Sequence, residues 1–241
     1  MKMTKKLLSV VLAVVMALSL TIPAMATNVT DLSNMEFHST NPGLQRALEQ
    51  IDPQYIEDYS KLSFEEKENK LKELAHTYGT GDVLNEADSA FVLLNRYEEE
   101  NMPKTRVGSG EKWYDVYKTQ YGVEVNLYGN MRQTIVAVAG TNTFGGTATL
   151  WVKSGAVQRV DLEINHIAYG LMGTSAPFVG VLYNGSVTMS KSGNNQTTKM
   201  DKEKSYGAVV CLYTTMNASA TVCTSSGDEF TVTSELWKIV Q

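Results

Sequence analysis

Residues 148–164 read ATLWVKSGAVQRVDLEI, and they decide the fold class because their hydrophobic pattern has the period of a β-strand. Apolar and polar residues alternate on both sides of the segment Ser154-Gly155-Ala156. Glycine accepts the positive φ that a three-residue hairpin loop requires. The stretch therefore predicts a β-hairpin, and with it an antiparallel β fold.

The register of this hairpin predicts a binding surface. Pairing Leu150 with Val160 keeps the apolar sides of the two strands together, whereas a slip of one residue would set Leu150 against Arg159. The pairing leaves Trp151, Arg159 and Asp161 on the polar face. An indole beside a guanidinium offers a flat apolar platform and a fork of hydrogen-bond donors, which suits a glycan or a peptide. We expect these three residues to form a binding site, unless a helical layer covers the face and buries Trp151.

The same alternation extends over residues 111–241. Val123, Val125 and Leu127 alternate with polar residues, and Gly129-Asn130 predicts a turn. Short runs rich in Thr, Val, Ser and Gly follow, with frequent turn signals. This combination favours an antiparallel β-sandwich, with a barrel as the alternative.

Residues 27–101 have the period of helices instead. Pro42 suits the first position of a helix, and Ser63 with Glu66 matches a capping box. Residues 102–110 contain Pro and Gly and predict a linker. The fold class is therefore α+β, with an N-terminal acidic helical region followed by an antiparallel β domain that we expect to fold by itself.

The two cysteines, Cys211 and Cys223, are predicted to form a disulfide. Residues 206–214 and 218–225 have the pattern of two strands joined by a turn near Met216-Asn217. Folding that hairpin sets Cys211 opposite Cys223, at a separation close to that of a bridge. An exported chain meets an oxidising environment, where such a pair becomes oxidised.

The first 26 residues have the order of features of a secretory signal peptide. Lys2, Lys5 and Lys6 precede an apolar run that ends at Leu20, and a small-residue cleavage site follows at Ala26. The run is shorter than the roughly 20 residues that a spanning helix needs. We therefore expect a secreted, extracellular protein with no membrane span after removal of residues 1–26.

The charge balance excludes two classes of partner. The chain has 21 Lys+Arg against 26 Asp+Glu, and the excess lies in residues 27–104, where 16 Asp+Glu stand against 7 Lys+Arg. Nucleic acids and anionic lipid surfaces bind concentrated Lys and Arg, so we expect neither as a partner. His38, His76 and His166 stand far apart without metal-ligand spacing, and we expect no metal and no cofactor.

Three functions stay open. The first is a non-catalytic extracellular binding or adhesion module whose partner is a glycan or a protein, since β-sandwiches often bind and no catalytic set is visible. The second is a secreted effector, such as a toxin or a bacteriocin-like protein, with residues 27–106 as an acidic pro-segment. The third is a secreted hydrolase whose site is assembled from distant residues.

Overall fold

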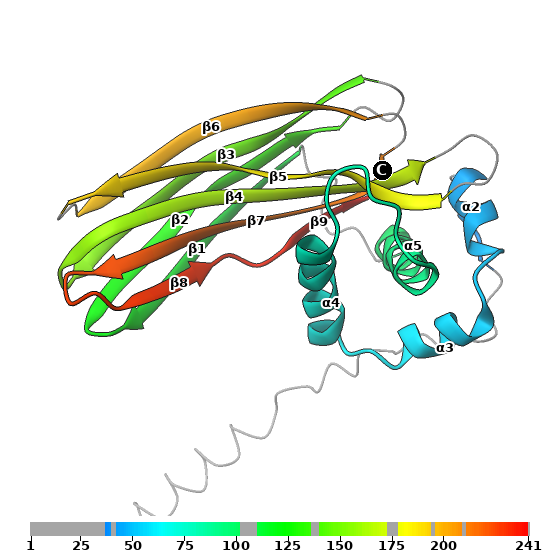
Figure 1. Ribbon diagram of the computed structural model, residues 1–241, viewed down its shortest axis with the longest axis horizontal. Coiled ribbons are helices and arrows are strands. Elements are labelled where there is room, and N and C mark those ends of the chain that lie inside the picture. Colours follow the sequence, from blue (N-terminus) through cyan, green and yellow to red (C-terminus); the bar gives the residue numbers. More distant parts are fainter. Residues whose placement is uncertain are drawn as a thin grey trace, which may run out of the picture.

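The computed structural model combines two antiparallel sheets with a group of helices at one end (Figure 1). It describes residues 37–39, 42–101, 110–135, 140–172, 178–193, 196–208 and 211–240. The α+β class with two facing sheets is confirmed. The predicted signal peptide, residues 1–26, and all of the predicted linker except Gly110 lie outside the described residues.

The helices begin where the sequence supplies capping groups. Ser63 accepts a hydrogen bond from the amide of Glu66, whose carboxylate accepts one from the amide of Ser63, so the predicted capping box is present. Asp52 caps the preceding helix by accepting from the amide of Gln54. The described helices are α2 (Pro42–Leu48), α3 (Pro53–Ser60), α4 (Phe64–Thr77) and α5 (Glu86–Asn101). Within the described residues, none of them is long and apolar enough to cross a membrane.

The strands form two sheets in which all pairs are antiparallel. The four-stranded sheet has the order β1-β2-β3-β6, with β1 (Glu111–Gln120), β2 (Val123–Thr134), β3 (Gly140–Ser154) and β6 (Thr197–Ala208). The five-stranded sheet has the order β5-β4-β7-β8, with β4 (Val157–Met172), β5 (Phe178–Ser192), β7 (Cys211–Thr224) and β8 (Glu229–Thr233), while β9 (Trp237–Val240) also pairs with β7.

The predicted hairpin of residues 148–164 is wrong, because the segment Ser154-Gly155-Ala156 passes from one sheet to the other. Leu150 on β3 is paired with Leu127 of β2, and Val160 on β4 is paired with Val222 of β7. Both belong to the buried core between the sheets. The alternation predicted correctly which side of each strand is buried. It does not show whether two successive strands pair within one sheet or face each other across the core.

A second predicted turn also lies inside a strand. Gly129 and Asn130 are part of β2, and the chain turns instead at Tyr121-Gly122, between β1 and β2. These two residues have φ values of +51° and +73°. Two-residue hairpin turns of type I′ require positive φ at both central positions, which Asn, Asp and Gly usually occupy. The turn was missed in the sequence because its first central residue is a tyrosine.

The predicted disulfide between Cys211 and Cys223 is wrong. The two residues are the first and the last but one of a single strand, β7, which continues through Met216 and Asn217. Their Cα atoms are twelve residue steps apart along the strand, which is about 40 Å, whereas a bridge allows at most about 7 Å. Both thiols are free, with Cys211 buried and Cys223 half-buried.

We therefore expect the thiol of Cys223 to react quickly with a thiol reagent in the native protein. The thiol of Cys211 should react only after unfolding. Burial protects Cys211 and raises the pKa of its thiol to about 12, which suppresses the reactive thiolate. Titration with a disulfide reagent before and after adding guanidinium measures both thiols, and Cys211→Ser is the control that removes the slow one. Detection of no thiol even in denaturant would restore the bridge.

The helices cover one end of the outer face of the five-stranded sheet. Their apolar side chains share a core with Ile167, Tyr169 and Tyr213 of that sheet. Polar contacts tie the same surfaces together, since Arg96 Nε donates to the carbonyl of Leu212 at 2.9 Å. Among the described residues, this helical core contains none from the four-stranded sheet, whose outer face is turned away from the helices (Figure 1).

Lysines connect the two sheets along both of their open edges. Lys118 Nζ on β1 donates to the carbonyl of Thr231 on β8 at 2.7 Å. Lys202 Nζ on β6 donates to the carbonyl of Thr188 on β5 at 2.6 Å. Each edge strand of the four-stranded sheet is thus joined by a side chain to the backbone of an outer strand of the other sheet.

Candidate binding face

The outer face of the four-stranded sheet gathers most of the exposed aromatic side chains among the described residues. Trp113, Tyr117, Tyr128 and Trp151 are 71%, 58%, 40% and 46% exposed. Large aromatic side chains gain about 1.5–3 kcal/mol from full burial, so a fold without a use for them on the surface would bury them. A contiguous exposed apolar patch of this kind is typical of an interaction site. We call these four side chains the aromatic face.

The strand register places the four rings close together. Tyr117 on β1 is paired with Asn126 on β2, which is paired in turn with Trp151 on β3. Two residues further along β2, Tyr128 lies in the next row of the sheet. Trp113 lies one row beyond it on β1, and because side chains two apart on a strand point to the same side, all four share one face.

A hollow of about 500 Å³ opens between three of these rings, those of Trp113, Tyr128 and Trp151. Its lining comes from three neighbouring strands: Trp113, Tyr114, Asp115, Asn126, Tyr128, Gly129 and Trp151. Gly129 lies at its base with a φ of +156°, and a Cβ atom there would come within 2.1 Å of the carbonyl oxygen of Thr147. Only glycine fits this position, so the shape of the hollow depends on it.

Two hydrogen-bonded polar pairs lie among the rings. Asn126 Nδ2 donates to the carboxylate of Asp115 at 2.5 Å. Asn130 Oδ1 accepts from both the amide and the hydroxyl of Thr147, at 3.0 and 2.6 Å. A carboxylate can accept several hydrogen bonds, so Asp115 keeps acceptor capacity for a ligand after bonding Asn126. These pairs hold polar atoms in fixed positions beside the aromatic rings.

A lysine sits at one border of the aromatic face. Lys153 Nζ lies 4.4 Å from the ring centroid of Tyr117 and 5.6 Å from that of Trp151. It also pairs with Glu124 at 3.5 Å. An ammonium group over an aromatic ring is attracted by the negative face of the ring. Lys153 lies closer to the ring of Tyr117, so it covers Tyr117 more than Trp151.

The structure separates the three residues that the sequence predicted as one site. Trp151 lies on the aromatic face, and the alternative that helices bury it is wrong. Arg159 and Asp161 lie on the five-stranded sheet, where the guanidinium pairs with Asp161 at 2.9 Å and with Glu229 at 3.1 Å. Trp151 and Arg159 therefore belong to different sheets and point away from each other across the core.

Three members of the aromatic face were missed from the sequence. The alternation Trp113-x-Asp115-x-Tyr117 places these side chains on one side of a strand and was the available signal. Placing Tyr128 beside them required the order of the strands, which the wrong turn at Gly129-Asn130 concealed.

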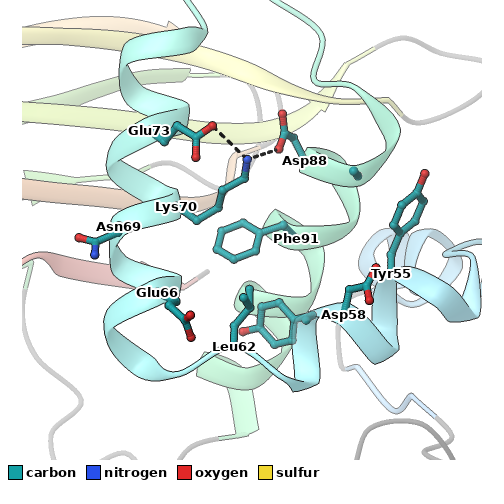
Figure 2. Close-up of a pocket in the computed structure, with 11 residues that line it drawn as sticks. Tyr55, Asp58, Leu62, Glu66, Asn69, Lys70, Glu73, Asp88 and Phe91 are labelled. Carbon is teal, nitrogen blue, oxygen red and sulfur yellow. Dashed lines mark hydrogen bonds and ion pairs between the residues drawn. The ribbon is translucent and has the colours of Figure 1, made fainter.

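A second hollow, of about 490 Å³, lies between α3, α4 and α5 (Figure 2). Three of its polar groups pair with one another: Lys70 reaches over Phe91 to Asp88 at 3.0 Å and to Glu73 at 3.4 Å. Asp88 also accepts from the hydroxyl of Tyr78 at 2.7 Å. These contacts hold the helices together, so this hollow is a weaker candidate than the aromatic face.

His166 is the histidine that the fold places in the core between the sheets. Its Nε2 lies 2.9 Å from the hydroxyl of Tyr206, and its ring stacks on Phe144 with centroids 4.7 Å apart. Burial lowers the pKa of His166 to about 3, because the charged imidazolium loses its hydration. The ring is neutral and closed to solvent, so it belongs to packing. Within the described part of the chain, no group of three or more His, Cys, Asp or Glu could hold a metal ion.

Known proteins similar to this chain do not indicate its function. No family model and no curated protein matches the chain. Two similar solved structures are an X-ray structure of a Northeast Structural Genomics Consortium target and a structure described as manganese lipoxygenase of Gaeumannomyces graminis with partial zonadhesin of Komagataella pastoris. The first is 15% identical over 51% of this chain and 89% of its own, with a TM-score of 0.26. The second is 10% identical over 57% of this chain and 76% of its own, with a TM-score of 0.21. Neither likeness bears on function.

Proposed function

We propose that this protein is an exported, non-catalytic module that binds an extracellular glycan through the aromatic face. The observation that carries the proposal is the gathering of four exposed aromatic rings on one sheet face, with Asp115 and Asn126 held among them. A sugar ring has an apolar face of C–H groups and a rim of hydroxyls. The aromatic rings suit the first, and the exposed carboxylate of Asp115, held in place by the buried Asn126, suits the second.

Export and partner class follow from the same proposal. The signal peptide expected at residues 1–26 would deliver the aromatic face outside the cell, where glycans are abundant. A protein partner is the alternative occupant, because exposed Trp and Tyr are also common in protein interfaces. A secreted effector with residues 27–106 as a pro-segment, or a secreted hydrolase, gains no support from the contacts of the described residues.

Replacing Trp151 with alanine should weaken glycan binding by about 1–3 kcal/mol, the usual loss for a central aromatic anchor. Because the side chain is 46% exposed, the same change should lower the melting temperature only slightly. A glycan array followed by calorimetry on the best ligand measures the first effect, and thermal melts measure the second.

The matched control is Phe64→Ala. Phe64 is 63% exposed, but it lies at the start of α4, away from the aromatic face. This variant should bind as tightly as the wild type. Equal binding by wild type and Trp151→Ala on every glycan would reject the proposed function, and capture of a peptide with the same Trp151 dependence would assign the face to a protein partner.

A further inference from the structure

We propose that the aromatic face takes a linear, neutral polysaccharide chain, which lies diagonally across β1, β2 and β3 over Trp113, Tyr128 and Trp151. This inference rests on the proposed function and names the class of glycan. It follows from the positions of the rings in the sheet, from the polar groups on both sides of them and from the charges nearby.

The register sets the three rings on a straight line. Trp113 on β1 is paired with Asn130 on β2, and Tyr128 lies two residues from Asn130 along the same strand. Tyr128 is paired with Thr149 on β3, and Trp151 lies two residues further on. Each step of the line moves one strand across and two residues along, in the same direction.

The length of the line excludes a single sugar as the complete ligand. Diagonal neighbours on one face of an antiparallel pair are about 7–8 Å apart, so the Cα atoms of Trp113 and Trp151 are separated by about 15 Å. A monosaccharide covers one aromatic ring. A chain of several sugars is needed to contact all three, and it must be extended because the rings share one sheet surface.

The polar pairs lie on opposite sides of this diagonal. Asp115 and Asn126 are on one side of Tyr128, where Asp115 is its direct neighbour on β1. Asn130 and Thr147 are on the other side, joined by hydrogen bonds of 2.6 and 3.0 Å. Asn126 and Asn130 are themselves buried, so a flat sugar chain with hydroxyls along both edges would meet the exposed carboxylate of Asp115 on one side and the half-buried Thr147 on the other.

The chemistry of the face favours a neutral chain with equatorial linkages. Asp115 lies beside Tyr128, the middle ring of the line, and would repel the carboxylates of an acidic polysaccharide. Equatorial linkages at both ends of each sugar ring give an extended, ribbon-like chain, whose ring faces carry the C–H groups that pack on aromatic side chains. Linked contacts strengthen one another because, after the first sugar binds, the next ones are held at high effective concentration.

The test is a chain-length series on the intact protein. Calorimetry with β-1,4-linked glucose, xylose and N-acetylglucosamine oligomers of two to six units should show at least a tenfold gain in affinity between two and six units for one series. Trp113→Ala, Tyr128→Ala and Trp151→Ala should each remove most of that gain, whereas Tyr128→Phe, which keeps the ring, should retain it.

Phe64→Ala is again the control, because Phe64 is 63% exposed but lies at the start of α4, outside the aromatic face. It should change the affinity for the six-unit oligomer less than twofold. Circular dichroism of each variant checks that the fold is intact.

The outcomes separate the inference from the proposed function. Affinity that does not rise beyond two units, a gain with length that Trp113→Ala retains in full, or Trp151-dependent binding confined to branched glycans would overturn the linear chain and leave a glycan module. Binding of no glycan in a Trp151-dependent way would overturn both.

Discussion

A chain that begins at Gly110 should be recovered only as aggregate, although the sequence predicts an independently folding β domain after residue 110. Without the helices, the outer face of the five-stranded sheet would expose six side chains that are now buried. They are Ile167, Tyr169, Val179, Val181, Leu212 and Tyr213. An exposed apolar patch of this kind promotes association, and the free energy of unfolding would fall with each of these side chains left in water.

Expression of residues 110–241 with size-exclusion chromatography measures this outcome, with the chain from residue 27 as the control. Adding the helical segment 37–101 as a separate polypeptide should restore soluble protein, since Arg96 and Tyr213 supply specific contacts across the two parts. A soluble monomer of residues 110–241 with a cooperative melt would contradict the prediction. It would support the two-domain division and the pro-segment hypothesis.

The second large effect is a loss of stability in mild acid that is due to His166. Its pKa is 6.5 in an exposed state and about 3 in the folded core. At pH values between these two, the unfolded chain binds a proton that the folded chain does not, so the free energy of unfolding decreases as the pH falls through this window. The slope is about 1.4 kcal/mol per pH unit, and the loss reaches roughly 5 kcal/mol near pH 3.

Urea unfolding at pH 7 and pH 4 of the wild type and of a His166→Leu, Tyr206→Phe double variant isolates this contribution. The double change removes the histidine without leaving the hydroxyl of Tyr206 unpaired. The double change alters no carboxylate and no other histidine, so the difference in slope reports His166. Equal slopes in the two proteins would show that the folded state accepts the proton without cost.

Local patterns predicted the buried sides of the elements well and the partners of the strands badly. The Ser63 capping box and the alternating strands depend on neighbours a few residues away, and both are present. The segment Ser154-Gly155-Ala156 obeys hairpin chemistry but crosses between sheets, because both arrangements bury the same side chains. For the same reason Cys211 and Cys223 had the right spacing for a bridge across a hairpin and lie on one continuous strand.

The candidate site was predictable only in part. Strand alternation was enough to place Trp151 on a polar face, and the structure exposes it. Its neighbours depend on sheet order, so Arg159 and Asp161 were predicted in place of Trp113 and Tyr128. The alternation along one strand predicts which side an aromatic residue faces. Which aromatic residues lie next to one another depends on the order of the strands in the sheet, and the sequence did not predict that order.

The lysine contacts at the open edges bear on how this protein behaves at high concentration. An unpaired edge strand offers carbonyl groups to a second molecule, and edge-to-edge pairing of that kind leads to fibrils. Lys118 and Lys202 occupy carbonyls of β8 and β5 from within the same molecule, and each adds a positive charge to the edge. These two contacts therefore oppose edge-to-edge pairing between copies of this protein at high concentration.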